Sequence, residues 1–245
     1  MKNKRMVYAA SPPEKKRLYD HEFSDEVTSY YDQFPIPPDI SLAVCQEWGL
    51  RHHLNGNFVI TIDIVPFSSK NNTGWSESIK CDKEVIEKIS SDQLKVFSRF
   101  EERLLIEKLS SERYGLPWKP VTSNQISENR FRNLEWMYAG NNATDNERKV
   151  IGKYFELFLK EREIFHESPK LLAFHKALSE KMQLPLDSMK RIFSLLCWRK
   201  VIVFNYEKIL TPRCLIEGNM FDFNMEAFDR CVQTESCKSM KQYRL

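Results

Sequence analysis

The most regular alternation of apolar and polar side chains lies at Phe58–Val65. It predicts a β-strand whose even-numbered residues share one face, while the odd-numbered residues share the other. The odd-numbered face carries Asp63 between Thr61 and Val65. A carboxylate in the middle of a strand is costly unless something on its face needs a negative charge. Asp63 is therefore the first candidate for a functional residue.

Periodic segments on either side of this strand predict a mixed α/β domain that ends near Gly140. Ser11 is the expected N-cap of the first helix, because proline follows it and Glu14 stands at the capping-box position. The segment Phe34–Pro38 is expected to break regular structure. We expect a helix at Lys15–Phe23, a hairpin turn at Asn55–Gly56 between two strands, and a strand near Trp75–Lys80. A helix at Asp92–Leu109 with Leu94, Phe97, Phe100 and Leu104 on one face, a strand at Pro117–Thr122 and a helix at Glu128–Met137 complete the order α-β-β-β-α-β-α.

The second half of the chain has the pattern of a winged-helix-like module. Thr144 and Glu147 form a second capping-box pattern, which opens an amphipathic helix through about Glu161. Two further helices, a β-like run and a second short strand follow, and from about Asp222 the polar tail is assigned no fold. The helices are expected at Pro169–Met182 and Leu186–Cys197, and the two strands of the wing at Val201–Phe204 and Lys208–Thr211.

Composition and charge narrow the class of protein. The net charge is +3, but residues 167–213 hold nine Lys or Arg against four Asp or Glu, so a surface for a polyanion is expected in the C-terminal third. The six cysteines form no C-x-x-C pair, which favours a reducing compartment over a disulfide framework. No apolar run approaches the ~18 residues of a membrane span. We therefore expect a soluble cytoplasmic protein.

Asp63 is followed by a pattern typical of restriction-type nucleases. Such enzymes need carboxylates to hold a divalent metal and a cation near the charge that develops on the phosphate. They place an acid on one strand and, on the next, a ligand with a lysine two residues later, so that both side chains share one face. Ser78-Ile79-Lys80 has this spacing, with Lys80 as the lysine. The pattern is weak alone, and a structural aspartate with a solvated lysine explains it better.

Three segments resemble the TnsA family, the endonuclease subunit of heteromeric (TnsABC) transposases. The first joins a Ser-x-x-Glu helix start at Ser11–Glu14 to a Val-x-x-Tyr-x-x-Gln-x-Pro segment at Val27–Pro35. The second is the strand Ile60–Asp63, which is similar to the family's strand with its metal-binding aspartate. The third is Leu116-Pro117-Trp118 with Val121-Thr122 and Asn133–Tyr138, similar to an I-P-W … T … N-I-E-W-L-Y pattern. The resemblance covers about residues 8–213.

The resemblance implies catalytic roles for Glu14, Asp63 and Lys80. Glu14 and Asp63 would hold Mg²⁺, for which Mn²⁺ may substitute, and Lys80 would position the attacking water or stabilise charge on the phosphate. Ser78 departs from the family, which usually has Gln or Glu there as a further metal ligand. Glu77 is adjacent but is expected on the opposite face of the strand.

The resemblance also implies the reaction and the partners. The reaction would be metal-dependent hydrolysis of one DNA strand at each transposon end, beside a DDE transposase of the TnsB type and an AAA+ ATPase of the TnsC type. The expected localisation is cytoplasmic, associated with the nucleoid. A restriction-endonuclease-like (PD-(D/E)XK type) domain is expected at residues 1–143, a connecting helix at 144–165 and a winged-helix-like domain with a polar tail at 166–245. Candidate DNA contacts in that domain are Lys190, Arg191, Arg199 and Lys200.

Several alternatives stay open. Glu14 is also explained as a capping residue, and Lys80 as a solvated lysine at a strand end. Adjacent His52 and His53 would point to opposite faces of a strand, so one packed and one exposed histidine is favoured over a metal pair. Trp118 and Trp136 are interpreted as core aromatics. The rival functions are a stand-alone restriction or repair nuclease and a catalytically inactive DNA-binding scaffold, in which Ser78 marks a lost metal site.

Overall fold

The structure is a computed structural model of the 245-residue chain. It describes residues 2, 7–52, 59–79, 83–90, 98–122, 124–125, 127–164, 169–217 and 219–241, without the side chains of 163–164 and 235–241. The chain divides into two compact units, Met1–Ile126 and Ser127–Leu245. Within the described ranges no helix combines the length and apolarity that crossing a membrane requires.

The first unit is built on a sheet whose described strands follow the order β1-β2-β3-β4. Neighbours β1 and β2 are antiparallel, as are β2 and β3, whereas β3 and β4 are parallel. The parallel pair needs a crossover, which the helices between β3 and β4 supply. The strands are β1 (Val27–Pro35), β2 (Thr61–Ser68), β3 (Ser76–Ile79) and β4 (Trp118–Val121).

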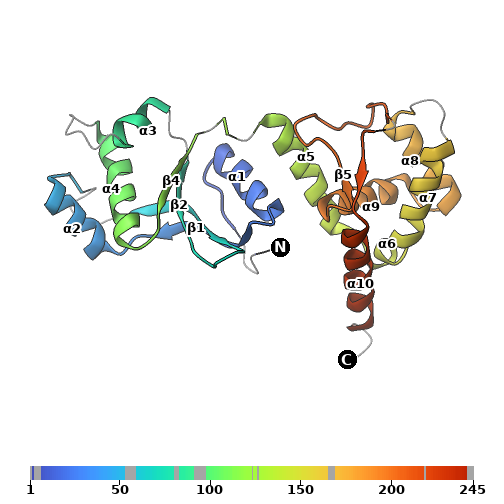
Figure 1. Cartoon of the computed structure of the whole chain (residues 1–245), viewed down its shortest axis with the longest axis horizontal. Helices are drawn as coiled ribbons and strands as arrows, with labels where there is room; N and C mark the ends of the chain where they lie inside the picture. Colours follow the sequence, from blue (N-terminus) through green and yellow to red (C-terminus); the bar gives the residue numbers. More distant parts are fainter. Residues whose placement is uncertain are drawn as a thin grey trace. The chain divides into compact units, whose positions relative to one another are not determined.

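Helices cover both faces of this sheet (Figure 1). Helix α1 (Pro12–Phe23) packs Leu18 against Ile64 and Ile79 on one face. On the other face, Cys45 of α2 (Pro38–Trp48) and Ile106 of α4 (Arg99–Arg113) pack against Val65. Helix α3 (Lys83–Ser90) adds Ile89 to Leu104 and Leu105 of α4. The predicted mixed α/β class is confirmed.

Local capping chemistry sets the helix starts, as the sequence predicts. Ser11 is the N-cap of α1, and its hydroxyl accepts a hydrogen bond from the backbone of Glu14. A capping box of Ser98 and Glu101 opens α4, where the sequence predicted a start at Asp92, although residues 91–97 lie outside the described part. Helix α2 ends at Gly49, whose φ of +62° suits glycine.

The break in regular structure expected at Phe34–Pro38 is confined to Ile36 and Pro37. Strand β1 runs through Pro35 and α2 begins at Pro38, because proline is tolerated at an edge strand and in the first turn of a helix. The expected order has three strands after the first helix. The first strand of the sheet is β1, before the proline-rich segment, where no pattern in the sequence predicted a strand. The hairpin turn at Asn55–Gly56 lies outside the described residues.

The alternation of side chains between the two faces of the sheet is interrupted where β1 pairs with β2 around Gln33 and Asp63. The β1–β2 register pairs Asp32 with Ile64 and Phe34 with Ile62, but it omits Gln33 opposite Asp63. Gln33 has a φ of +48°, a left-handed backbone that interrupts the pleat. Consequently Ile62 packs on the α4 side of the sheet and Ile64 on the α1 side. The expectation that the even-numbered residues of this strand share one face was wrong for that reason.

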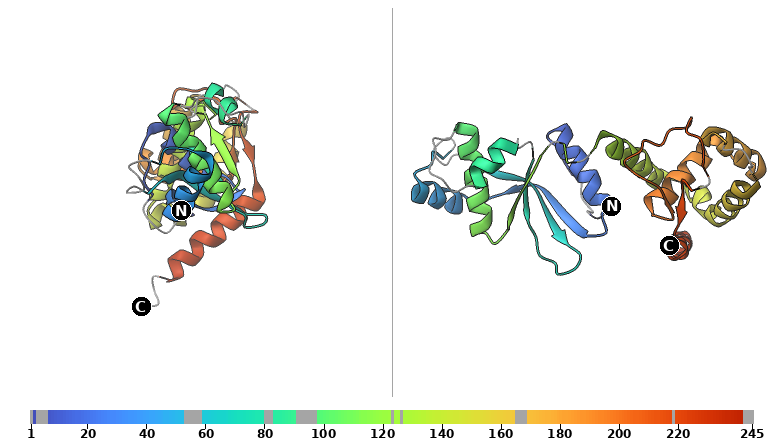
Figure 2. Two further views of the ribbon diagram at one scale, coloured as in Figure 1. Left: turned by 90° about the vertical axis from the view of Figure 1, so that its left-hand side faces the viewer. Right: turned by 45° about the horizontal axis from the view of Figure 1, so that its top comes forward.

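The second unit is mainly helical, with an aromatic core. Phe158, Phe174, Phe193 and Phe221 are almost completely buried and contact one another edge-to-face or stacked. Figure 2 shows its helices gathered around this core, with the last helix extending away from them. The elements are α5 (Glu128–Ala139), η2 (Gly140–Asn142), α6 (Asp145–Lys149), α7 (Ile151–Ile164), α8 (Leu171–Met182), α9 (Leu186–Trp198), β5 (Ile202–Val203), β6 (Asp222–Phe223) and α10 (Met225–Lys241).

The boundary between the units lies earlier in the chain than expected. Helix α5 belongs to the second unit, where Trp136 stacks on Phe193 of α9 with ring centroids 5.9 Å apart. A side chain at Gly140 would collide with the backbone of Leu195, so α9 passes directly over the end of α5. The predicted connecting helix is two helices, α6 and α7, because the backbone turns at Val150. Both belong to this unit.

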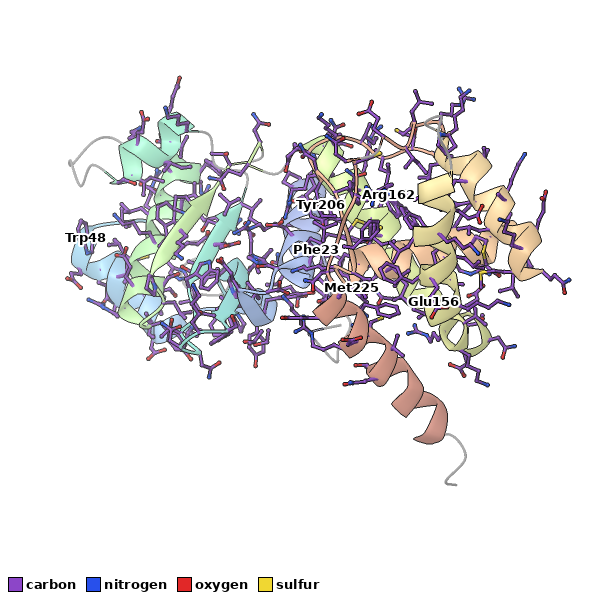
Figure 3. The ribbon with its side chains drawn as sticks, turned by 45° about the vertical axis from the view of Figure 1, so that its right-hand side comes forward. Phe23, Trp48, Glu156, Arg162, Tyr206 and Met225 are labelled. Atoms are coloured by element: carbon purple, nitrogen blue, oxygen red, sulfur yellow. The ribbon has the colours of Figure 1, made fainter. Side chains whose placement is uncertain are left out.

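The wing differs from the expectation in its second strand. Strand β5 pairs antiparallel with β6, not with Lys208–Thr211. The tail from Asp222, for which no fold was predicted, forms β6 and α10. Phe223 explains the ordering of β6, since its ring contacts Phe155 and lies under the guanidinium of Arg162 at 4.9 Å (Arg162 is labelled in Figure 3).

Candidate active site

Asp63 lies on β2 at the point where the β1–β2 ladder is interrupted. One of its carboxylate oxygens, Oδ2, accepts a hydrogen bond of 2.7 Å from the backbone N–H of Ile79 at the end of β3. The side chain is partly exposed. Asp63 thus lies on an inner strand and is held by a hydrogen bond from the backbone of the neighbouring strand.

Ser78 on β3 contacts a carboxylate that the sequence analysis did not identify. The Ser78 hydroxyl donates a hydrogen bond of 2.9 Å to Oε2 of Glu107 on α4, and it accepts one of 2.9 Å from the indole N–H of Trp118 on β4. Ser78 and Glu107 are 1% and 4% exposed. The serine that replaces the expected ligand therefore orients a glutamate that approaches from the helix above it.

Glu107 and Asp63 are close enough to interact electrostatically. Burial raises the pKa of Glu107 to about 7; Arg103 opposes this effect, and the negative charge of Asp63 adds to it. The Nε of Arg103 donates a hydrogen bond of 3.1 Å to Oε1 of Glu107. Burial of the Glu107 carboxylate beside the negative charge of Asp63 disfavours its ionised form, an effect that a bound cation would relieve.

Glu14 is buried at the start of α1 and is fully used in hydrogen bonds. Its carboxylate accepts from the backbone of Ala10 at 2.8 Å and from the Ser11 hydroxyl at 2.7 Å. It also accepts a longer hydrogen bond, 3.4 Å, from the amide of Gln33, whose own oxygen accepts from Thr61 at 3.1 Å. Glu14 thus caps its helix and is connected, through Gln33, to the strand position opposite Asp63.

The predicted residues are brought together only in part. Ser78 and Glu107 are hydrogen-bonded on the α4 side of the sheet, Asp63 is near enough to affect the pKa of Glu107, and Glu14 is linked through Gln33 to Thr61 of β2. Lys80 lies outside the described residues. Among the residues that the structure describes, no three His, Cys, Asp or Glu side chains are placed together to hold a metal ion. The roles of Glu14, Asp63 and Lys80 in catalysis, and of Ser78 as a ligand, stay predictions.

Glu77 lies on the α1 side of the sheet, opposite to Ser78, as the alternation of β3 predicted. Arg17 donates two hydrogen bonds to its carboxylate, at 2.6 and 2.8 Å, and His21 and Trp75 each contribute another contact. Burial acts to raise the pKa of Glu77, but these partners, Arg17 foremost, lower it to about 2. Its carboxylate binds α1 to the sheet and has no role as a ligand on the other face.

The basic residues proposed for DNA contact are mostly engaged within the second unit. Lys190 pairs with Asp187 at 2.9 Å, and Arg191 forms a forked pair with Glu147, the capping-box residue of α6. Helix α9, which carries Lys190 and Arg191, is buried from Met189 to Trp198 except for its charged positions. Arg199 is exposed, and Lys200 has a left-handed backbone with φ of +58°. Their contact with DNA stays a prediction.

The end of the third resembling segment has a structural role here. Asn133 is fully buried; its amide donates to the carbonyls of Tyr206 and Lys208, both at 2.8 Å, and its oxygen accepts from the backbone of Leu210. Trp136 stacks on Phe193 and Phe204. These contacts fix the loop after β5, which agrees with the interpretation of Trp136 as a packing residue.

Sequence reasoning missed Glu107 and Arg103. It placed Phe100 on the apolar face of its helix, whereas Phe100 is 51% exposed, and it did not pair Arg103 with Glu107. A signal was present: Glu107 follows the buried residues Leu104, Leu105 and Ile106, so it lies on the covered part of the helix. An acid at such a position needs a partner or a ligand.

Comparisons with known proteins add nothing to this geometry. No protein-family model matches the chain, and a search of curated proteins finds no significant match.

Proposed function

We propose that the protein is a metal-dependent DNA endonuclease whose metal ligands are Asp63 and Glu107. The observation that supports the proposal is a buried glutamate on α4, hydrogen-bonded to Ser78 of β3 and within electrostatic range of Asp63 on β2. Glu107 supplies the carboxylate that position 78 lacks. The departure at Ser78 is then a relocation of a ligand from a strand to the facing helix, and not a loss.

The residues present fit Mg²⁺ better than a closed structural metal site. Mg²⁺ keeps several waters and is held by one or two carboxylates together with substrate phosphates, so two protein carboxylates suffice. When bound, the ion lowers the pKa of a coordinated water and stabilises charge on the phosphoryl oxygens. Ser78 and Trp118 hold Glu107 in place, and Arg103 supplies a positive charge beside the phosphate.

The residues of the resembling segments support this assignment. Glu14 of the first segment contacts Gln33 of the same segment, Asp63 belongs to the second, and Trp118 of the third donates to Ser78. The elements α1-β1-β2-β3-α4-β4 have the order expected of a restriction-endonuclease-like core, with α2 and α3 as insertions. The order α7-α8-α9-β5-β6 is compatible with a winged helix whose wing spans the long loop before β6.

The transposon-specific part of the proposal rests on the resemblance. We infer that the substrate is double-stranded DNA at transposon ends, nicked on one strand, and that a TnsB-type transposase and a TnsC-type ATPase act beside this chain. In that proposal Glu14 and Lys80 complete the catalytic group, and Lys190, Arg191, Arg199 and Lys200 remain candidate DNA contacts. For Arg191, contact with phosphate requires opening its pair with Glu147.

A catalytically inactive scaffold is the second candidate. It is favoured by one observation, the absence of a three-ligand cluster among the described side chains. A stand-alone nuclease of the same fold would share the site and differ only in its DNA substrate.

Metal-dependent nicking of supercoiled plasmid distinguishes an enzyme from a scaffold. Wild type is expected to nick in Mg²⁺ or Mn²⁺ and not in EDTA, and Glu107→Gln is expected to be inactive. The matched control is Glu112→Gln, which removes an exposed carboxylate from the same helix and should leave nicking unchanged. Equal nicking by both variants would refute the role of Glu107, and no nicking by wild type on plasmid or on transposon-end DNA would favour the scaffold.

A further inference from the structure

A pocket of about 230 Å³ lies in the first unit beside the candidate active site. Its lining consists of Arg51, Arg99 and Arg103 with Phe100, Ile60 and Ile106. The volume is below the roughly 300–1,000 Å³ of pockets that enclose drug-sized ligands, so the pocket suits a small group. Its floor is apolar, since Ile60 and Ile106 are 6% and 2% exposed, while its rim carries guanidinium groups.

The three arginines differ in how they are held. Arg51 is fixed through its Nε by Glu102 at 3.0 Å, and Arg103 through its Nε by Glu107 at 3.1 Å. In the part of the chain that the structure describes, neither the amino groups of these two arginines nor the side chain of Arg99 has a further ion pair or hydrogen bond. The lining of the pocket is mostly carbon, so the arginines line it chiefly with their aliphatic stems, and their three guanidinium groups, set against Glu102 and Glu107, leave a net positive charge beside it. Such groups match phosphate oxygens.

Phe100 makes the pocket more than an anion site. The ring is 51% exposed, although the helical periodicity of its neighbours would predict a core position. An exposed aromatic ring among arginines is the combination with which proteins hold unstacked bases: the ring stacks on the base while the cations contact the backbone. A paired duplex offers no free base face, so the arrangement suits an unpaired nucleotide.

The helix connects this pocket to the carboxylates. Arg99, Arg103 and Glu107 are spaced by four residues and lie along one side of α4. At 1.5 Å per residue, Arg99 is about 12 Å from Glu107 along the helix axis. A DNA strand advances about 3.4 Å per nucleotide, so this distance corresponds to about three to four nucleotides.

We propose that this pocket binds one unpaired nucleotide of the DNA strand, within about four nucleotides of the phosphate that is cut, with Phe100 against the base and Arg51 and Arg99 on its phosphates. The inference rests on the proposed nuclease function and adds to it a preference for DNA that is distorted or single-stranded next to the cut. It predicts that gapped DNA binds more tightly than a continuous duplex.

Binding of fluorescent DNA tests the pocket in the Asp63→Asn background, in which the DNA stays intact. One probe is a duplex with a short single-stranded gap containing 2-aminopurine, and the other is the same duplex fully paired. Phe100→Ala is expected to weaken binding of gapped DNA about tenfold, since stacking contributes about 1–3 kcal/mol per base and 1.4 kcal/mol is tenfold. It should leave paired DNA within about twofold and abolish the quenching of 2-aminopurine.

Arg99→Ala is expected to weaken both probes and to reduce by about one the slope of log affinity against log salt. The matched controls are Tyr114→Ala, which removes another half-exposed ring, and Arg113→Ala, which removes an exposed arginine from the far end of α4. Both should bind like the background protein. Arg103 is left intact because it contacts Glu107.

The outcomes distinguish a failure of the pocket inference from a failure of the proposed function. If the background protein binds gapped DNA and Arg99→Ala and Phe100→Ala bind it equally well, the pocket inference is refuted while the nuclease proposal stands. If Arg99→Ala weakens binding but Phe100→Ala behaves like Tyr114→Ala, the base contact is refuted. Failure of the wild-type chain to bind any DNA would overturn the proposed function first.

Discussion

The two faces of the sheet hold buried glutamates in opposite electrostatic conditions. On the α1 side, Glu77 accepts hydrogen bonds from Arg17 and Trp75, contacts His21, and has a pKa lowered to about 2. On the α4 side, Glu107 has one arginine and a serine as partners, lies near Asp63, and has a pKa raised to about 7. Both side chains are almost completely covered.

The difference separates a carboxylate that holds the fold together from one that is placed for a ligand. Every oxygen of Glu77 is satisfied by its own chain, so nothing is gained by adding a cation there. Glu107 is held in position but shares its surroundings with a second negative charge. Residues 77 and 78 are adjacent, yet the alternation of β3 directs one to the structural face and the other to the candidate site.

The largest effect is expected from Asp63→Asn, which removes the carboxylate nearest to Glu107. A bound metal contributes several kcal/mol of charge stabilisation in the transition state, so nicking should fall about a thousandfold. The near-UV circular dichroism should stay that of the wild type. Asp39→Asn, on the exposed first turn of α2, is the control and should retain activity. Loss of tertiary signal in Asp63→Asn would make Asp63 a structural residue.

Next in size is the stability of Glu77→Gln compared with Glu107→Gln. Removing one partner of a buried ion pair costs about 3–5 kcal/mol, and Arg17, at 22% exposure, places Glu77→Gln at the low end, about 3 kcal/mol. Glu107→Gln relieves repulsion with Asp63 and should not lower the free energy of unfolding. Urea unfolding measures both. A larger loss for Glu107→Gln would reverse the assignment of the two faces.

The same two residues should give opposite pH dependences in EDTA. The pKa of Glu77, about 2 when folded against an ordinary 4.5, means that it stabilises the fold above pH 4.5 and that this contribution is lost as pH falls towards 2. The pKa of Glu107, about 7 when folded, means that its contribution is present below pH 4.5 and is lost as pH rises towards 7. Glu77→Gln should flatten the acid limb of the stability curve, and Glu107→Gln the limb between pH 4.5 and 7. Identical curves for the two variants would contradict the comparison.

A smaller effect should follow from moving the carboxylate back to the strand. Ser78→Glu in a Glu107→Ala background places an acid where the resemblance expects a ligand, and the removed side chain leaves room for it. We expect recovery of about tenfold in Mn²⁺ affinity over Glu107→Ala alone, measured by calorimetry, because hard cations gain from each added charged oxygen. Ser78→Met in the same background controls for side-chain length. Equal affinity of the two double variants would show that position 78 does not face the metal.

The sequence predicted the elements that carry strong local chemistry. Ser11 and Thr144 begin helices because their hydroxyls bond to the backbone of the following turn, an interaction within four residues. Strand β1 was missed because Val27–Pro35 is rich in polar residues and its stability comes from pairing with β2. The last strand and helix were missed for the same reason, since Phe223 is ordered by Phe155 and Arg162 from a distant helix.

The candidate site residues on β2 and β3 could be predicted from the sequence, whereas the residue on α4 could not. Asp63 could be recognised because a carboxylate interrupts an apolar strand, and Ser78 because of its spacing to Lys80. Glu107 could not be assigned to them, since the contact with Ser78 joins residues that are 29 positions apart. The face change at Gln33 depends on a left-handed backbone at a non-glycine residue, which alternation alone does not reveal.

The most direct test of the metal site is the position of Mn²⁺ in crystals of the wild-type protein, located by its anomalous scattering. The account predicts one peak on the α4 side of the sheet, within about 2.0–2.6 Å of carboxylate oxygens of both Asp63 and Glu107, the range of hard cations bound to oxygen. The peak should disappear in Glu107→Gln and persist in Glu112→Gln. A peak bound to Asp63 and Glu14 with Glu107 still on Ser78, or no peak in a protein that nicks DNA with Mn²⁺, would contradict it.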